Sequence, residues 1–310
     1  MESIILPIDK EVLKQELTSD LFLRYTNKSG NEIYIFSAEQ APNLMREVGR
    51  IREECFRAGG GGTGSSCDVD EFDLMPNGYK QLIVWNPEKQ VIVGGYRFIL
   101  GRDVIAHSEG TDAMATSHMF TYSDLFVKDY LPYTIELGRS FVANDFQSTR
   151  VDGLSIFALD NLWDGLGALT VIYPEIRYFF GKVTMYKTYN PFCRNLILKF
   201  MEIYFKDKED LVKPITPLPI QIEEDVVKRV FKANNIMADY KTLKKTVREY
   251  GINIPPLFSA YISLSPELRM LGTAVNEEFG YVEETGILIA IEHILDEKKK
   301  RHIDTFEKNI

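Results

Sequence analysis

Cysteine is scarce in this chain. Only three occur in 310 residues, at Cys55, Cys67 and Cys193, and no two of them form a CxxC pair. An odd number of widely spaced cysteines argues against a disulfide framework. We therefore expect a protein of a reducing compartment, the cytoplasm.

Long apolar runs and excess positive charge are also missing. No stretch approaches the ~20 apolar residues that a membrane-spanning helix requires. The first residues, Met-Glu-Ser-Ile-Ile-Leu-Pro, lack the basic and apolar regions of a signal peptide, so we expect none. The net charge of -9 opposes general binding to nucleic acid. An acidic partner or a membrane surface would have to meet a local basic patch.

Several familiar catalytic patterns are absent as well. The four histidines are dispersed, and none stands at metal-ligand spacing from another, so no metal site is expected. Ser117 and His118 adjoin without a GxSxG motif, which disfavours a serine hydrolase. Cys193 has no histidine partner in the sequence, and we expect a buried structural thiol there.

A glycine run, Gly59–Gly62 with Gly64, resembles a phosphate-binding loop only superficially. A P-loop follows a strand and carries a Lys after its last glycine, whereas here a helix pattern precedes the run and no Lys follows Gly64. The run predicts a mobile loop, which could close over a substrate. The acidic segment 68–73 does not fit an EF-hand, and it predicts either a site for a cationic group or a solvated turn.

The periodicity of apolar residues predicts alternating helices and strands. Two β-rich runs joined by Asn86-Pro87-Glu88-Lys89 indicate a hairpin. The order hairpin, strand, helix, strand, helix predicts an α/β sheet that contains a parallel pair. The expected helices are Glu11–Leu17, Ala41–Phe56, Asp152–Leu166, 191–205 and Glu223–Asn234, and the expected strands are Glu32–Phe36, Gln81–Trp85, Gln90–Leu100, Thr134–Val142, Tyr178–Met185, Leu257–Leu264 and Gly286–Ile291.

These elements divide the chain into four parts. Residues 1–40 form a mixed leader, and residues 41–205 form the main core. Residues 206–250 are charged and helical, which predicts an inserted helical lobe. Residues 251–310 supply the last strands of the core and a Lys/Glu-rich tail, Asp296–Arg301, expected to be a solvated helix end.

The most informative segment is the strand Thr134–Val142. Glu136 and Arg139 interrupt its apolar pattern, and charges inside a strand are costly unless they are paired or functional. A regular strand places residues three apart on opposite faces, but a bulge near Gly138 could bring them together. The alternative is an edge strand with a surface ion pair. The following helix could also present free N–H groups to a phosphate or thioester.

Several short motifs resemble a known family. Glu136-Leu-Gly-Arg139-Ser-Phe141-Val and Asn161-Leu-Trp163 are similar to the hemolysin-like, acyl-carrier-protein-dependent N-acyltransferases of ornithine- and glycine-lipid synthesis. The segment Ile254–Tyr261, then Gly272-Thr-Ala and Phe279, resembles that family's C-terminal signature. Arg52, Phe56, Asp70, Asp73 and Arg97 lie in a pattern similar to the acyl-homoserine-lactone synthases. The resemblance covers residues 40–205 and 250–292, but the CoA loop of the RxxGxG/A kind is matched poorly by Gln147–Gly153.

The resemblance implies a GNAT-type α/β (α+β) fold, with a mixed central sheet flanked by helices and a helical insertion at 206–250. It implies an enzyme that transfers an acyl group from a thioester to an amine. Glu136 would be the base, Arg139 would orient acidic groups or the phosphopantetheine arm, and Tyr186 or Tyr189 would protonate the leaving thiol. Backbone N–H groups of the same strand would receive the oxyanion. The implied substrate-binding residues are Arg52, Phe56, Asp70, Asp73, Arg97 and Phe141.

The partners implied are a small amino acid, such as glycine or ornithine, and an acyl carrier protein. Its acyl-phosphopantetheine, or acyl-CoA, would be a co-substrate, with no tightly bound cofactor. Lys182, Lys187 and Arg194 are the expected docking patch. The expected product is a lyso-aminolipid carrying a fatty or 3-hydroxy fatty chain, and peripheral contact with the inner membrane stays open. Two alternatives remain, an acetyl-CoA-dependent N-acetyltransferase and a non-enzymatic, membrane-active protein.

Overall fold

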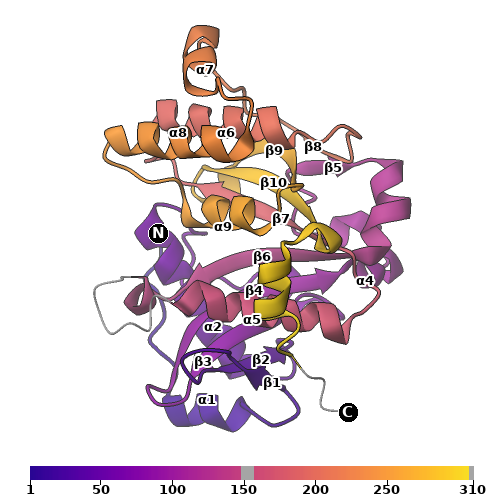
Figure 1. The fold of residues 1–310 in the computed structure, drawn as a ribbon. Coiled ribbons are helices and arrows are strands. Elements are labelled where there is room, and N and C mark those ends of the chain that lie inside the picture. The colour runs from indigo at the N-terminus through magenta and orange to yellow at the C-terminus, as the bar shows by residue number, and fades with distance from the viewer. Residues whose placement is uncertain (148–156, 307–310) are drawn as a thin grey trace.

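A computed structural model describes residues 1–147 and 157–306, and its centre is an eight-stranded sheet (Figure 1). The strand order is β1-β2-β3-β4-β6-β7-β10-β9, so the N-terminal strands form one edge and the C-terminal hairpin forms the other. In that order the strands are Phe22–Tyr25, Glu32–Phe36, Lys80–Asn86, Val91–Leu100, Thr134–Val142, Tyr178–Met185, Val282–Ala290 and Arg269–Asn276; β5 (Phe120–Tyr122) and β8 (Val212–Pro214) form a separate small sheet.

One pair in the centre differs from all the others. β6 and β7 are parallel, whereas the other neighbours in the large sheet pair antiparallel. The parallel register runs from Thr134↔Tyr178 to Leu137↔Gly181 and, among the described residues, goes no further. Yet β6 continues beside β4 to Val142, and β7 continues beside β10 to Met185. The sheet therefore opens between β6 and β7 in the second half of both strands.

Helices cover both faces of the sheet. Since side chains alternate along a strand, odd and even residues meet different layers. Leu137 and Val183 face a core shared with α5, α6, α8 and α9, whereas Phe180 faces a core built on the β5–β8 sheet. A third core joins α2 to β2 and β3. The helices α1 to α10 are Lys10–Glu16, Pro42–Gly59, Glu71–Leu74, Gly101–Ala106, Ala158–Ile172, Pro191–Phe205, Glu224–Val230, Ile236–Glu249, Pro256–Leu264 and Asp296–His302.

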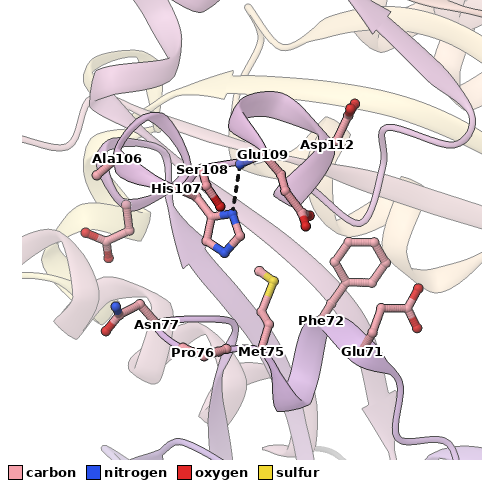
Figure 2. Close-up of a pocket in the computed structure, with 11 residues that line it drawn as sticks. Glu71, Phe72, Met75, Pro76, Asn77, Ala106, His107, Ser108, Glu109 and Asp112 are labelled. Atoms are coloured by element: carbon pink, nitrogen blue, oxygen red, sulfur yellow. Dashed lines mark hydrogen bonds between the residues drawn. The ribbon is translucent and has the colours of Figure 1, made fainter.

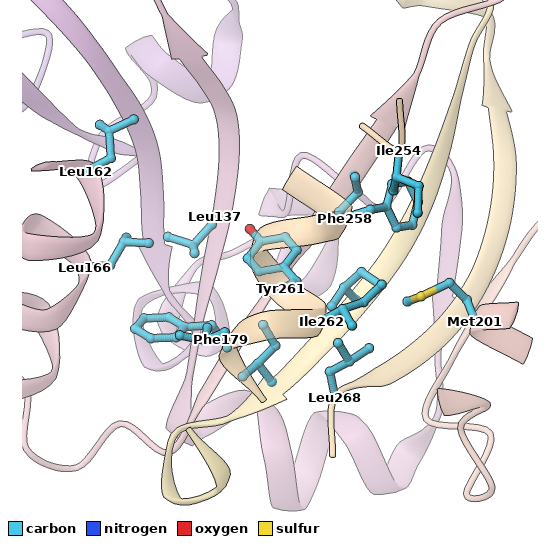
Figure 3. Packing of buried hydrophobic residues seen from close by; sticks show 14 of the residues in the cluster. Leu137, Leu162, Leu166, Phe179, Met201, Ile254, Phe258, Tyr261, Ile262 and Leu268 are labelled. Carbon is cyan, nitrogen blue, oxygen red and sulfur yellow. The ribbon is translucent and has the colours of Figure 1, made fainter. Parts of the chain in front are cut away.

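The hairpin, the parallel pair and α6 lie where the sequence predicts them, and the mixed sheet flanked by helices confirms the predicted fold class. The expected strand Leu257–Leu264 is wrong, because Pro256–Leu264 is the helix α9. A short apolar run does not distinguish a buried helix from a strand, but Pro256 occupies the first helical position, where its missing N–H is harmless. Figure 3 shows Phe258, Tyr261 and Ile262 of α9 packed into the core.

Three other segments depart from expectation in detail. Strand β9 was not predicted, although its residues pair with β10 along most of their length. Helix α5 begins at Ala158, and the earlier part of the expected helix, 152–156, lies outside the described residues. The charged tail is a helix, α10, but it is held against α5, because His302 binds Asp164 and Arg301 binds Asp160.

Candidate active site

The opening between β6 and β7 contains a cavity of about 430 Å³. Its walls come from both faces of the sheet, because Glu136, Lys182 and Glu284 lie on one face and Leu137, Met185 and Tyr261 lie on the other. The cavity therefore passes through the sheet. The first face contributes charged groups, and the second contributes almost entirely apolar and aromatic groups.

A bulge shapes the β6 wall. Gly95 pairs with Phe141 and Arg97 pairs with Gly138, so Tyr96 alone opposes Arg139 and Ser140. Arg139 has a φ of 46°, in the left-handed region that few residues with a Cβ adopt. The bulge predicted near Gly138 is therefore present. It does not join Glu136 to Arg139, because each binds other partners.

Glu136 is buried at the start of the opening, with 2% of its surface exposed. The Tyr79 hydroxyl donates to its carboxylate at 2.6 Å, and the same hydroxyl accepts a hydrogen bond from the Ala115 backbone N–H at 2.8 Å. Burial raises the pKa of Glu136, although the hydrogen bond from Tyr79 and the charge of Lys182 act in the opposite direction. A carboxyl with a raised pKa, facing a cavity, is suited to accepting and releasing protons.

Arginine and aspartate alternate beneath the β4 and β6 wall. Arg97 binds Asp70 at 2.7 Å and Asp73 at 3.3 Å, and Arg139 binds Asp68 at 2.9 Å. The chain of ion pairs ends at the fully buried Arg52, which binds Asp73 at 3.1 Å.

This network corrects the expectations for the acidic segment. Asp68, Asp70 and Asp73 bind arginines, so the segment is neither a free acidic site nor a solvated turn. Arg52, Asp70 and Asp73 do not line the cavity, whereas Arg97 and Arg139 do. The first three residues therefore hold the two arginines in position and are not placed to contact a substrate there.

Lys182 and Glu284 form an ion pair on the other side of the opening. Their charged atoms are 2.6 Å apart, and the side chains are only 11% and 7% exposed. Asn276 and Thr184 also donate to Glu284, at 2.9 and 3.2 Å. Burial alone would raise the pKa of Glu284, but the ammonium of Lys182 and the hydrogen bond from Asn276 hold it below its usual value.

The second face of the cavity is apolar. Its wall includes Leu159 and the start of α9, where Pro255, Pro256 and Leu257 follow one another. Tyr261 stands across from Leu137 (Figure 3) and stacks edge-on against Trp163 at 5.9 Å. Pro255, Pro256, Leu257 and Tyr261 belong to the Ile254–Tyr261 motif of the sequence, so that motif builds part of this wall.

Two tyrosines stand where the cavity meets the end of β7. The Tyr189 hydroxyl donates to the Asn253 carbonyl at 2.7 Å and so fastens the loop before α9. Tyr186 lies against the glycine run, where a Cβ on Gly59 would come within 2.7 Å of its hydroxyl. The run is therefore not a free loop but the surface on which Tyr186 rests. Its next residues are bound by Glu53, which accepts hydrogen bonds from Thr63 and Gly64.

The three residues expected to form a docking patch are separated. Lys182 lies inside the cavity with Glu284, which differs from the surface position expected. Arg194 binds Glu283, and both side chains are mostly buried. Lys187 is exposed, above the ring of Tyr281. Phe56 and Phe141 both line the cavity, as a substrate-binding role requires. Cys193 is fully buried, as expected for a structural thiol.

A larger cavity, of about 750 Å³, lies elsewhere, between α3 and the segment after α4 (Figure 2). Its rim is acidic, with Glu71, Asp103, Glu109 and Asp112. The Nδ1 atom of His107 accepts a hydrogen bond from the Glu109 backbone. No carboxylate here is opposed by a lysine or arginine of the lining, so this cavity offers less to an anionic or zwitterionic substrate than the opening between β6 and β7.

Some residues of the site escaped the sequence analysis as functional groups. Glu283 and Glu284 precede the expected strand Gly286–Ile291, but β10 begins at Val282 and includes both, so that alternation of faces directs one of the two inward. Tyr79 lies just before β3, and no sequence pattern marked it as a partner of Glu136. Within the described residues there is no group of three or more His, Cys, Asp or Glu side chains that could hold a metal ion. Nor does any helix there have the length and apolar character needed to cross a membrane.

Known proteins resemble this chain in one domain and along almost its whole length. A domain family described as an acetyltransferase (GNAT) domain matches residues 51–156. The solved structure of FeeM, an N-acyl amino acid synthase from uncultured soil microbes, aligns with a TM-score of 0.40 at 12% identity. That alignment covers 84% of this chain and 90% of FeeM. The domain match therefore identifies a GNAT-type domain within this chain.

Two curated relatives extend over nearly the whole chain. The glycine N(alpha)-acyltransferase of Bacteroides thetaiotaomicron is 57% identical over 306 residues, which are 99% of this chain and 91% of the relative. The glycine N(alpha)-acyltransferase of Phocaeicola vulgatus is 55% identical over 308 residues, or 99% and 94% of the two chains. The chain belongs to the family of these two enzymes and is an N-acyltransferase.

Proposed function

We propose that this enzyme transfers a fatty acyl chain, in the 3-hydroxy form or not, from a carrier-bound thioester to the amine of glycine or a similarly small amino acid. The product is a lyso-aminolipid. The observation that carries the proposal is the cavity through the sheet, which joins a charged half to an apolar half at one narrow opening. A charged acceptor fits the first half, an acyl chain fits the second, and the two reacting atoms meet between them.

Glu136 is the proposed base. An ammonium group cannot attack a thioester, so the acceptor must first lose a proton, and the Glu136 carboxylate takes it. The neutral amine then forms a bond to the thioester carbon. When the tetrahedral intermediate collapses, the carbon–sulfur bond breaks and the second proton of the nitrogen passes to the departing thiolate. The reaction consumes the thioester and the ammonium form of the acceptor and yields an amide, a thiol and the proton that Glu136 then releases to water.

The bulge on β6 is the proposed source of a hydrogen bond to the oxyanion of the tetrahedral intermediate. Two residues, Arg139 and Ser140, oppose the single Tyr96, so a backbone N–H at this point lacks a partner in the ladder. A donor of this kind, directed into a cavity, stabilises the charge that develops on the carbonyl oxygen. Tyr186 is the proposed relay for the second proton of the nitrogen, because it lines the cavity: its hydroxyl donates to the thiolate and takes that proton in return. Tyr189 already donates to Asn253, so we assign it to the cavity wall.

We propose an acyl carrier protein as the donor, which is acidic and needs a basic surface. Lys187 is exposed near the mouth of the cavity. Helix α8 adds a row of exposed cations. Its end adjoins the same mouth, because the ring of Tyr250 lies 5.1 Å from that of Phe192, just before the loop to which Tyr189 donates a hydrogen bond. The cations of α8 are Lys241, Lys244, Lys245 and Arg248. A cytoplasmic reaction, with peripheral contact at the inner membrane when the lipid product leaves, completes the proposal.

The test is a reconstituted assay with purified enzyme, amino acids and matched acyl donors, followed by mass spectrometry of the products. We expect N-acylglycine from a long-chain acyl carrier protein, with acetyl-CoA a poor donor. Turnover of acetyl-CoA without any turnover of long-chain donors would contradict the proposal and favour an N-acetyltransferase. Loss of the lipid from cells on deletion, and its return only with an active enzyme, would exclude a non-enzymatic role.

A further inference from the structure

A buried ion pair that borders a cavity is costly to keep. Lys182 and Glu284 lie mostly out of water, and replacing such a pair by apolar residues often stabilises a protein. The Glu284 carboxylate has several hydrogen-bond donors, because Lys182, Asn276 and Thr184 all donate to it. The Lys182 ammonium has three N–H donors, and among the described residues Glu284 is its only ion-pair partner. Within the same part of the chain it also donates to the weak acceptor Met119 Sδ, at 3.6 Å. Lys182 can therefore donate a further hydrogen bond into the cavity.

The position of Lys182 suits the carboxylate of an amino acid. Glu136 pairs in register with Phe180, so Lys182 stands two residues further along β7 on the same face of the sheet. The parallel pairing ends between them, at Leu137 and Gly181, so the two charged groups stand on opposite sides of the opening. An α-amino acid whose ammonium meets Glu136 extends its carboxylate away from β6, and the cation on that side is Lys182.

The two arginines of the lining are less available. Arg97 is 3% exposed, and two aspartates bind it. It also stands on β4, on the same side of the opening as Glu136. Arg139 is bound by Asp68 and Asp70 and lies 4.4 Å above the ring of Phe279. Each guanidinium is thus committed to carboxylates of the chain itself.

We infer that Lys182 binds the carboxylate of the acceptor amino acid and that Glu284 is a positioning residue that holds the Lys182 ammonium in place. This assignment rests on the proposed function, since it presumes an amino-acid acceptor. It makes the enzyme selective for acceptors that carry a carboxylate next to the amine, and it explains why an ion pair is retained in the wall of the cavity.

The experiment compares glycine with glycinamide, which has the amine but no carboxylate. The wild-type enzyme is expected to prefer glycine strongly. In Lys182→Met the KM for glycine should rise about 10- to 100-fold, the loss typical of a hydrogen bond to a charged group. The KM for the acyl donor should change little, and the preference for glycine over glycinamide should largely vanish. Glu284→Gln should weaken the preference less, because the ammonium remains but is no longer held by an opposite charge.

The chain provides a matched control one residue away. Glu283 is a carboxylate on the same strand, partly buried and bound to Arg194, but it does not line the cavity. Glu283→Gln and Arg194→Met should therefore retain the preference for glycine even if they lower stability. If Lys182→Met keeps the wild-type ratio of glycine to glycinamide turnover while Arg97→Lys loses it, the carboxylate is bound by Arg97 and the inference is wrong. Failure of the wild-type enzyme to acylate any amino acid contradicts the proposed function instead.

Discussion

Two glutamates of the cavity have opposite environments. Glu136 is buried beside a neutral tyrosine, and burial raises its pKa, whereas Glu284 accepts hydrogen bonds from an ammonium and two neutral groups, and its pKa is lowered. Carboxyls whose environments separate their pKa values commonly divide their roles in an active site. Here Glu136 binds a proton more readily than an ordinary glutamate, and Glu284 keeps its negative charge more firmly beside Lys182.

Glu136→Gln is expected to lower kcat about 100- to 10,000-fold, the usual range for losing a general base. In the wild-type enzyme, kcat should rise with pH through the raised pKa of Glu136, and this rise should be absent in the variant. The measurement is a steady-state pH profile with saturating donor. A variant within twofold of wild type would show that another group removes the proton.

The same substitution should change how the free energy of unfolding depends on pH, and the direction of the change follows from the raised pKa. A carboxyl whose pKa is raised on folding binds its proton more tightly in the folded state, so stability falls as pH rises from the ordinary Glu value through the raised one. Glu136→Gln removes this fall. At pH 8 the variant should unfold in urea at a concentration equal to or higher than the wild type does, which separates lost chemistry from lost folding.

The aspartates under β4 should behave unequally. Two buried arginines hold the pKa of Asp73 far below its usual range against the cost of burial, so it stabilises the fold at neutral pH and stops doing so as pH falls through that low value. Asp73→Asn leaves the fully buried Arg52 without a charged partner, and breaking such a pair costs about 3–5 kcal/mol of unfolding free energy. Asp70→Asn, at a side chain that is 21% exposed, should cost clearly less. Equal losses in urea denaturation would contradict this difference.

At the scale of elements, the sequence predicted most of the sheet and the position of the bulge, because alternation, turn residues and misplaced charges are local signals. It failed where the decisive contact is distant. The apolar run at Leu257 was predicted to be a strand, although it is a helix that fills the gap between α5, α6 and the sheet. Likewise the aspartates of segment 68–73 gave no sign of which arginines they bind, because their partners come from α2, β4 and β6.

The end of α2 and the end of β7 are predicted to act together. Gly59 has a helical backbone, so Gly59→Ala should not strain α2 and could stabilise it by up to about 1 kcal/mol. Its new methyl group must nevertheless displace the end of the Tyr186 ring together with its hydroxyl. We expect kcat to fall by an amount similar to that in Tyr186→Phe, without a loss of thermal stability.

A double-mutant cycle checks this coupling. If Gly59 acts through the tyrosine hydroxyl, the double variant Gly59→Ala, Tyr186→Phe should be no slower than Tyr186→Phe alone. Additive losses would mean that the two positions affect the reaction independently.

At the scale of the whole molecule, an excess of negative charge determines which surfaces can bind an acidic partner. The net charge is -9, so an acidic carrier protein is repelled except where cations gather. The docking patch expected from the sequence is not formed, because Lys182 and Arg194 are mostly buried and form ion pairs with Glu284 and Glu283. Whether a lysine is exposed depends on the packing of distant strands, which spacing along the chain does not reveal.

The basic row on α8 gives a test. Reversing Lys241 and Lys245 to glutamate together should reduce kcat/KM for an acyl carrier protein about tenfold or more at low salt, and the effect should shrink as salt rises. The same variant should use a long-chain acyl-CoA or acyl-pantetheine as the wild type does. The control is Lys300→Glu on α10, which lies along α5 and away from α8. An equal loss with both kinds of donor, or in the control, would contradict docking on α8.

The break in pairing between β6 and β7 also has a consequence for the order of substrate binding. In the proposed function, acceptor and donor approach from opposite sides of one sheet, so neither has to leave before the other arrives. We therefore expect direct transfer within a ternary complex, without an acylated enzyme, and initial-rate plots for the two substrates should intersect instead of running parallel. In this proposal the sheet separates a polar compartment from an apolar one. A water-soluble amino acid and a lipid chain react through the opening between β6 and β7 while the first stays in the polar half of the cavity and the second in the apolar half.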